Sequence, residues 1–439
     1  MIKNSVYLIT AMLFFFCISL TACQMIAPPA ITATSTEIET PTVVPATPTP
    51  VVNPGLNMDA AKISPQYFDA TEFEQEMELM SIPPLNPDAP VYLQYLIDNP
   101  VMLADYPQYA TLSQKEPPYN ICFSDSGVED PWRVVGYIDM REQVEQFRSD
   151  GYIKNFYHLD AQGDDAKQIS DIQQIIDDPQ KCDLLIVAAN SSKALPSIIE
   201  KACQVMPVIQ IGRSTQSNCP VITVQSIGNY AFGISGALFI VNNLPEGGNV
   251  LAFRTQPNTD ILEQRWGAAR KILEQNPQLN IIGVEFAGFD NFEANMVLND
   301  YQTKYGTIDA IWADTGSTAV SILKSLNEAG IPYPKAVVGE DQEEFLEYWK
   351  QNGLTAIAPT FPAYQWRTAV LSSVKFLQGE TFQHQWILPQ PEITAVNLDQ
   401  FQNPDMPLLH YATCGCEDMK NYPSAWKNPD INAYVDVVP

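Results

Sequence analysis

The 439-residue sequence has few basic side chains and almost no histidine. It holds 24 Lys and Arg against 51 Asp and Glu, for a formal net charge of −27, and only three histidines. A chain this acidic repels nucleic-acid phosphates, so we expect no nucleic-acid partner. His158, His384 and His410 are scattered along the chain, which gives no sign of a histidine-based catalytic or metal site.

Motifs typical of enzymes are also missing. The chain has no GxGxxG dinucleotide loop, no phosphate loop ending in GK[ST] and no GxSxG nucleophile elbow. Asp314 and Asp341 could in principle form the carboxylate pair of a glycosidase, but a cleft that binds hydroxyl groups explains both residues equally well. We therefore predict a binding protein rather than an enzyme, with no cofactor and no bound metal.

Long hydrophobic runs are absent after the first residues. The run from Val6 to Leu20 follows Lys3 and ends in Leu-Thr-Ala-Cys at Cys23. About 15 apolar residues are fewer than the roughly 20 that span a bilayer, which favours a cleaved signal peptide over residues 1–22 rather than an uncleaved membrane anchor. The pattern resembles a bacterial lipoprotein signal, and that resemblance implies that Cys23 becomes the lipidated first residue of the mature chain.

Three further segments lie outside the main body of the chain. Residues 23–57 are rich in Pro and Thr, which predicts an extended tether; roughly 34 residues could reach on the order of 100 Å. Residues 58–118 form an acidic N-terminal extension and residues 402–439 a C-terminal extension. The sequence assigns neither extension a function.

Between Tyr119 and Phe401, strands and amphipathic helices alternate, as in doubly wound parallel sheets. Isoleucines spaced by three and four predict a helix whose polar residues Gln168 and Asp171 face water. The apolar strand LLIVAA that follows ends abruptly at Asn190. Polar turns after such strands predict one edge of a ligand site, because open α/β sheets bind ligands at the carboxyl ends of their strands.

The chain repeats this pattern. The segment that begins at Asp183 and the segment that begins at Asp309 each give strand, small polar turn, helix and a further strand. We therefore expect an α/β fold of two Rossmann-like lobes with parallel sheets, joined by a hinge and separated by a ligand cleft. The predicted bounds are 119–228 plus 361–389 for lobe 1 and 229–360 plus 390–401 for lobe 2. We expect the hinge crossings near 226–229, 358–360 and 388–392.

Several short motifs stand in a fixed order: DPWR, DAQGDDAKQISDIQQII, PVIQIGR, IGNYAFG, EQRWGAA, AGFDN, WADTGSTAV, VVGED and EITAVNLDQF. Taken together, they resemble the periplasmic sugar-binding proteins of the ribose-binding type over roughly Asn120 to Phe401. The resemblance implies the type 1 periplasmic-binding-protein fold, a sugar or polyol ligand in a cleft that closes on binding, and an ABC permease as partner. We also expect a monomer in the cell envelope, and the lipoprotein-like signal implies that it is lipid-anchored to the membrane outside the cytoplasm. The alternative is a lipoprotein that presents its sugar to a membrane sensor kinase or chemoreceptor.

The same resemblance implies ligand-contacting positions. This chain departs from the family where Gly212 and Gly228 replace aspartates and Arg133 replaces an aromatic residue. The carboxylate lost at Gly212 leaves the identity of the sugar open. The implied ligand-binding residues are Asp130, Trp132, Arg133, Arg213, Asn229, Arg265, Phe289, Asp314, Asp341 and Thr360.

The residue types suit a sugar, which offers apolar faces and a rim of hydroxyl groups. Trp132 and Phe289 would stack from opposite lobes, while ionised side chains would form strong hydrogen bonds with the rim. The competing interpretation is that both aromatic residues belong to lobe cores and that the charged residues are ordinary surface groups.

Six cysteines remain if Cys17 leaves with the signal peptide and Cys23 carries lipid. An even number outside the cytoplasm favours disulfides. The first pairings that we predict are Cys122 with Cys182 and Cys203 with Cys219. The pair at 414 and 416 could form a strained short bridge, provide one end of a longer bridge or bind a metal weakly, and disulfide use is the favoured alternative.

Overall fold

The computed structural model describes residues 65–128, 130–212, 215, 217–287 and 294–427. The signal peptide, Cys23, the tether, Arg213 and Phe289 lie outside the described residues. Among the described residues, no helix is both long and apolar enough to cross a membrane.

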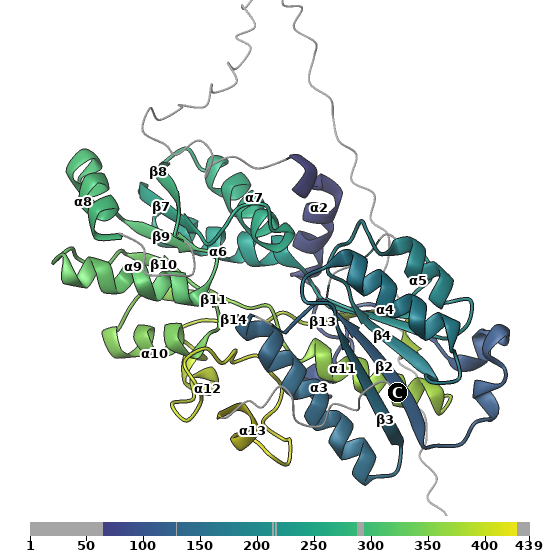
Figure 1. Cartoon of the computed structure of the whole chain (residues 1–439). Coiled ribbons are helices and arrows are strands. Elements are labelled where there is room, and N and C mark those ends of the chain that lie inside the picture. The colour runs from purple at the N-terminus through teal and green to yellow at the C-terminus, as the bar shows by residue number, and fades with distance from the viewer. Residues whose placement is uncertain (1–64, 129, 213–214, 216, 288–293, 428–439) are drawn as a thin grey trace, which may run out of the picture. The chain divides into compact units, whose positions relative to one another are not determined.

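Lobe 1 is built on a six-stranded, all-parallel sheet in the order β13-β6-β5-β4-β2-β3. Helices α3 and α11 pack on one face and α4 and α5 on the other (Figure 1). Alternate residues of β2 serve the two faces: Ile121 and Phe123 pack toward α3 and α11, and Cys122 packs toward α4 and α5. The strands are β2 (Tyr119–Asp125), β3 (Ile153–Asp160), β4 (Leu184–Ala188), β5 (Val208–Ile211), β6 (Ile222–Ser226) and β13 (Gln385–Leu388), and the helices are α3 (Pro131–Ser149), α4 (Asp165–Asp177), α5 (Pro196–Ala202) and α11 (Gln365–Leu377).

Lobe 2 repeats this design with the strand order β14-β11-β10-β9-β7-β8. Its strands are parallel except β14, which pairs antiparallel with β11. Helices α6 and α7 cover one face, and α8, α9 and α10 cover the other. The strands are β7 (Gly248–Arg254), β8 (Leu279–Phe286), β9 (Ala310–Ala313), β10 (Ala336–Val338), β11 (Ala356–Pro359) and β14 (Glu392–Ile393), and the helices are α6 (Asn229–Asn243), α7 (Asp260–Glu274), α8 (Ala294–Tyr305), α9 (Gly316–Glu328), α10 (Glu343–Asn352) and α12 (Leu398–Phe401). The predicted fold class, two α/β lobes with parallel sheets, is confirmed.

The chain passes between the two sheets three times. It leaves β6 at Ser226 and enters α6 at Asn229, it passes from β11 to α11, and it passes from β13 to β14. The carboxyl ends of β6 and β13 therefore lead directly into lobe 2, so that a ligand at these strand ends lies next to both lobes.

Both extensions fold onto the lobes. Helix α2 (Ala70–Leu79) is capped by Asp69, whose carboxylate accepts hydrogen bonds from Thr71 and Glu72 N–H groups, and it packs against α6. Strand β1 (Pro100–Val101) pairs antiparallel with β12 (Phe382–Gln383). Helix α13 (Ser424–Lys427) packs on α3. Short 3-10 helices connect these parts: η1 (Pro65–Tyr67), η2 (Val91–Leu93), η3 (Leu103–Asp105), η4 (Pro107–Tyr109) and η5 (Leu112–Gln114).

One expectation for the helix α4 is wrong. Gln168, expected to face water, is fully buried: its Nε2 donates to the Ala188 carbonyl at 3.0 Å, and its Oε1 accepts from the Asn190 N–H at 2.9 Å. Asp171 is also largely buried, and Lys167 pairs with it at 2.7 Å. Gln168 thus connects α4 to the carboxyl end of β4, where the sheet leaves backbone groups without partners of their own.

The described residues contain three disulfides. Cys122 pairs with Cys182 and Cys203 pairs with Cys219, which confirms both predicted pairings. The third bridge joins Cys414 to Cys416, so the structure contains the short bridge among the three alternatives. In the described part of the chain, the spacing of His410, Cys414 and Cys416 would suit a metal ion. Because the two sulfurs are bonded to each other, neither is available as a thiolate ligand.

Candidate functional site

A cavity of about 890 Å³ lies where both lobes and the N-terminal extension meet. This volume falls within the range of about 300–1,000 Å³ that is typical of small-molecule sites. Lobe 1 lines the cavity with the carboxyl ends of its strands and the start of α3, lobe 2 lines it with the starts of α6 and α7, and α2 forms a third wall. Described residues that line it include Trp132, Arg133, Lys193, Gly212, Gln225, Ser226, Asn229, Asp260, Gln264, Phe361 and Trp366 from the two lobes, and Tyr67, Asp69, Glu72, Glu76 and Glu78 from the extension.

The apolar wall of the cavity is a cluster of three aromatic rings around Trp132. Its indole Nε1 donates to the carbonyl oxygen of Phe361 at 2.6 Å. The Trp132 ring centroid lies 5.3 Å from that of Phe361 and 5.8 Å from that of Trp366. The local sequence holds the indole in place, because Asp130 caps α3 by accepting from the Arg133 N–H and Pro131 opens the first turn.

Arg133 supplies the positive charge beside this wall. Its guanidinium lies 3.0 Å from the Asp130 carboxylate and 3.5 Å from that of Asp125, which is fully buried at the end of β2. Arg133 keeps 18% of its side chain exposed and lines the cavity. Its guanidinium is therefore oriented by two carboxylates and still accessible to a solute, as a donor to hydroxyl groups.

In lobe 2, the side chains of the predicted rim are bonded to other groups of the protein. Arg265 donates to the Asp314 carbonyl at 2.7 Å, forms an ion pair with Glu340 at 2.8 Å and stacks over the Phe232 ring at 4.0 Å. Both Asp314 carboxylate oxygens accept from the Thr255 N–H, at 3.0 and 2.9 Å, and one also accepts from its hydroxyl at 2.6 Å. Burial raises the pKa of Asp314 to about 6, against the lowering effect of these hydrogen bonds and of Arg265.

Two further predicted residues of this lobe, Asp341 and Thr360, also have protein partners. One carboxylate oxygen of Asp341 accepts from the N–H and from the hydroxyl of Thr413, at 2.9 and 2.5 Å. Burial and the neighbouring Glu340 raise the pKa of Asp341 to about 7. Thr360 donates its hydroxyl to the Pro391 carbonyl at 2.6 Å. None of Arg265, Asp314, Asp341 and Thr360 is among the described residues that line the cavity.

Asn229 lies at the first position of α6 and lines the cavity, with its amide donating to Gln264 Oε1 at 3.0 Å. The preceding Gly228 has φ of +151°, and a Cβ there would collide with the carboxyl group of Glu76. Glu76 Oε2 accepts from the Ala231 N–H at 2.9 Å and so caps α6 from another helix. Burial, more than any other effect, raises the pKa of Glu76 to about 8.

The structure thus brings Trp132, Arg133 and Asn229 to one cavity, with Asp130 holding Arg133. Sequence reasoning missed Glu76, Phe361 and Trp366. A signal for Phe361 and Trp366 was their position: Phe361 directly follows the predicted crossing at 358–360, and Trp366 comes soon after it. A side chain that follows a hinge strand lies beside both lobes. No local pattern distinguishes Glu76 from the other carboxylates of α2.

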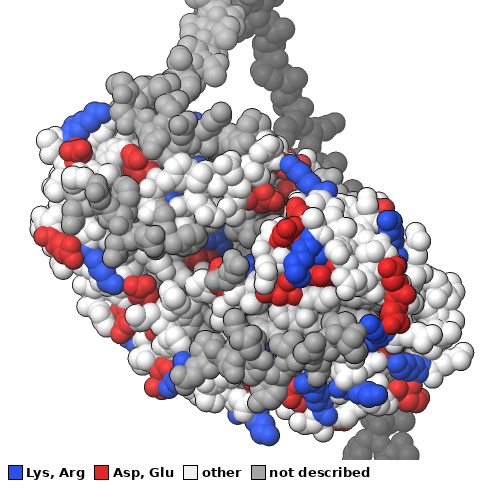
Figure 2. All heavy atoms as spheres, in the orientation of Figure 1, with Lys and Arg blue, Asp and Glu red and all other residues white. Residues whose placement is uncertain are grey.

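Acidic and basic side chains are interspersed over the face of the molecule shown in Figure 2, between larger areas of uncharged residues. The side chains that line the cavity are likewise mixed, with Arg133 and Lys193 beside the acidic residues of α2 and Asp260 in the lining. This arrangement suits a neutral solute with many hydroxyl groups, which needs both donors and acceptors.

Comparisons with known proteins agree with this geometry. The ribose import binding protein of Bacillus subtilis (strain 168) is 26% identical over 227 residues, which cover 51% of this chain and 72% of that protein. A solved ABC transporter solute binding protein from Bacillus halodurans C-125, with bound myo-inositol, is similar in fold with a TM-score of 0.55 at 19% identity, covering 66% of this chain and 99% of that one. The fructose binding periplasmic domain of a hybrid two component system gives a TM-score of 0.52 at 19% identity, covering 65% of this chain and 93% of that one. Residues 123–381, more than half of the chain, match the family described as Periplasmic binding protein domain, and the chain therefore belongs to that family.

Proposed function

We propose that this protein is the solute-binding component of an ABC importer and captures a sugar or polyol in the cavity between its lobes. The family consists of binding proteins rather than enzymes and acts outside the cytoplasm. The observation that carries the proposal is the pairing of an aromatic wall, Trp132 with Phe361, and an accessible Arg133 in one cavity of about 890 Å³. Aromatic faces bind the C–H faces of a sugar, and the guanidinium binds its hydroxyl rim.

The test is a thermal-shift screen of the mature chain against pentoses, hexoses, polyols and amino sugars, followed by calorimetric titration of every compound that raises Tm. A ligand that binds only the folded state raises Tm by an amount that grows with the logarithm of its concentration over Kd. We expect at least one compound with D-ribose-like or myo-inositol-like hydroxyl groups to bind with one-to-one stoichiometry. If no member of the panel shifted Tm at millimolar concentration, a sugar-binding role would be wrong.

A sensor function is the second candidate, because a periplasmic domain of a hybrid two component system shares the fold. An importer component should co-purify with a permease and an ATPase after cross-linking in native membranes, and a sensor component should co-purify with a histidine kinase or chemoreceptor. In both cases the sugar occupies the same cavity, so the identity of the captured membrane protein decides between them.

We also propose that Cys23 anchors the protein to the membrane through lipid. The proposal is supported by the apolar run that ends at Cys23 and by the tether of residues 23–57. Cys23→Ser should leave the precursor uncut and unlipidated, as measured by mass spectrometry of the membrane fraction. A wild-type protein that still carried residues 1–22 would contradict the proposal.

A further inference from the structure

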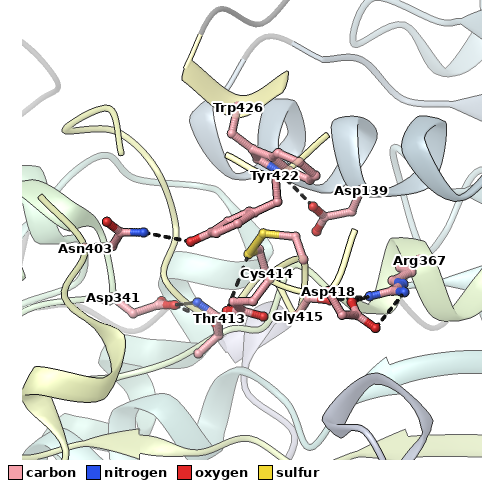
Figure 3. The surroundings of a disulfide bond; sticks show 12 residues. Asp139, Asp341, Arg367, Asn403, Thr413, Cys414, Gly415, Asp418, Tyr422 and Trp426 are labelled. Carbon is pink, nitrogen blue, oxygen red and sulfur yellow. Dashed lines mark hydrogen bonds and ion pairs between the residues drawn. A yellow bond between two sulfur atoms is a disulfide. The ribbon is translucent and has the colours of Figure 1, made fainter. Parts of the chain in front are cut away.

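The C-terminal extension makes contacts with both lobes. On lobe 2, the backbone N–H groups of Glu343 and Glu344 donate to the carbonyls of His410 and Leu408, both at 2.8 Å. On lobe 1, the Trp426 indole donates to Asp139 at 2.9 Å (Figure 3), and Asn421 donates to Glu142 at 2.7 Å. Within the segment between these anchors, residues 411–416 are all buried.

Within this segment, two hydroxyl groups reach the carboxylates of lobe 2. The Tyr411 hydroxyl donates to Glu340 Oε2 at 3.1 Å, and Glu340 is also the ion-pair partner of Arg265. The Thr413 hydroxyl and N–H both donate to the same oxygen of Asp341, as Figure 3 shows. The backbone N–H of Ala412 donates to the Asp341 carbonyl at 2.9 Å.

These contacts are chemically the ones that a sugar would make. A sugar hydroxyl bound by a buried carboxylate donates an O–H⋯O hydrogen bond, and the hydroxyls of Tyr411 and Thr413 do the same. Asp341 is one of the residues that the family resemblance assigns to the ligand. Thr413 already bonds to one of its carboxylate oxygens, the other oxygen is buried without a hydrogen-bond partner, and the whole residue is 0% exposed. Asp341 therefore presents no accessible oxygen to a solute.

The segment is also held too firmly to exchange with a small ligand. The disulfide between Cys414 and Cys416 closes the turn at Gly415, whose φ is +58°, and both cysteines are almost fully buried. Arg367 of lobe 1 donates to the Gly415 carbonyl at 2.6 Å and pairs with Asp418 at 2.5 Å. Displacing the segment would break these contacts together with those on lobe 2.

We propose that residues 411–413 are a permanent internal occupant of the lobe 2 half of the cleft and thereby determine the protein's specificity. The solute is confined to the cavity formed by lobe 1, α2 and the starts of α6 and α7, where Trp132, Arg133 and Asn229 contact it. The location of the solute rests on the proposed function, whereas the occupancy of Asp341 by Thr413 does not.

Occupancy is tested without any sugar by a double-mutant cycle on the full mature chain. Asp341→Ala and Thr413→Val should each lower Tm, and the double variant should melt no lower than Asp341→Ala alone, because both changes remove the same contact. Thr413→Ser keeps the hydroxyl and should melt close to wild type. Fully additive Tm losses, or equal Tm for the Val and Ser variants, would overturn the proposal.

The location of the solute is tested by titrating D-ribose and myo-inositol into the folded Thr413 variants. If the segment is permanent, Thr413→Val should bind within about twofold of wild type, since the solute does not compete for Asp341. A tenfold or greater rise in affinity in Thr413→Val, or a tenfold loss in Asp341→Ala with unchanged Tm, would show that solute binds Asp341 and would overturn the proposal. If neither sugar bound wild type, the proposed function would need another ligand class, and the double-mutant cycle would still decide the occupancy of Asp341.

Discussion

The two halves of the cleft carry similar residue types but use them differently. In lobe 1, Trp132 and Arg133 line the cavity and Arg133 retains accessible surface. In lobe 2, Arg265 and Asp314 are almost completely buried and bonded to protein groups. A charged side chain is available to a ligand only if the protein leaves part of its hydrogen-bonding capacity free. The two lobes therefore show that the residue type alone does not distinguish the proposed binding residues from structural ones. The hydrogen-bond partners that each side chain already has within the protein make that distinction.

The largest effect should come from breaking the lobe 2 network at Arg265. Arg265→Ala leaves Glu340 buried without its cation, which typically costs about 3–5 kcal/mol of folding free energy. Chemical denaturation of the sugar-free protein measures this loss, with Arg265→Lys as a milder control that keeps the charge but loses the two-pronged geometry. An Arg265→Ala variant with wild-type stability and weakened sugar binding would place Arg265 among the binding residues and reverse the comparison.

The second-largest effect should be a loss of sugar affinity when Trp132 of lobe 1 is changed. Trp132→Ala removes the central ring of the aromatic wall, and the loss of such an anchor costs about 2 kcal/mol or more, roughly a 30-fold loss of affinity. Trp132→Phe keeps most of the stacking area but loses the hydrogen bond to the Phe361 carbonyl, so it should bind with intermediate affinity. Calorimetric titration measures both variants. Equal affinities for wild type and a cooperatively folded Trp132→Ala would contradict a stacking role.

The smallest effect concerns the third wall of the cavity and depends on pH. Burial raises the pKa of Glu76 to about 8, and burial also raises that of its neighbour Glu72. The folded state holds the Glu76 proton more tightly than the unfolded chain does. The resulting stabilisation of the folded state is therefore complete below about pH 4.5 and is lost as the pH rises through about 8. The glutamine of Glu76→Gln does not titrate. The Tm of wild type should therefore fall relative to the Tm of this variant between pH 5 and pH 9.

Thermal melts at several pH values measure that difference. Glu74→Gln, a matched change at an exposed position of the same helix, should give the pH profile of wild type. Parallel profiles for wild type and Glu76→Gln would mean that Glu76 keeps its charge in the folded protein and that α2 does not seal this side of the cavity from water.

The outcome for α4 shows why side-chain exposure was harder to predict than the helix itself. The isoleucine spacing that predicted α4 depends only on residues within one helix, and Ile172 and Ile175 are buried as expected. The burial of Gln168 depends on unpaired backbone groups at the ends of β2 and β4, which only the assembled sheet brings next to the helix.

The sequence by itself determined the two α/β lobes, the disulfides of Cys122 and Cys203 with their partners, and the aromatic and charged residues at the start of α3. These features follow from periodicity, from spacing and from motifs that are contiguous along the chain. Only the tertiary structure decided that Glu76 fills the space left by Gly228 and that Thr413 occupies Asp341. Both contacts join segments far apart in the sequence, and a hydrogen bond between such segments leaves no local pattern because any of many carboxylates or hydroxyls could make it.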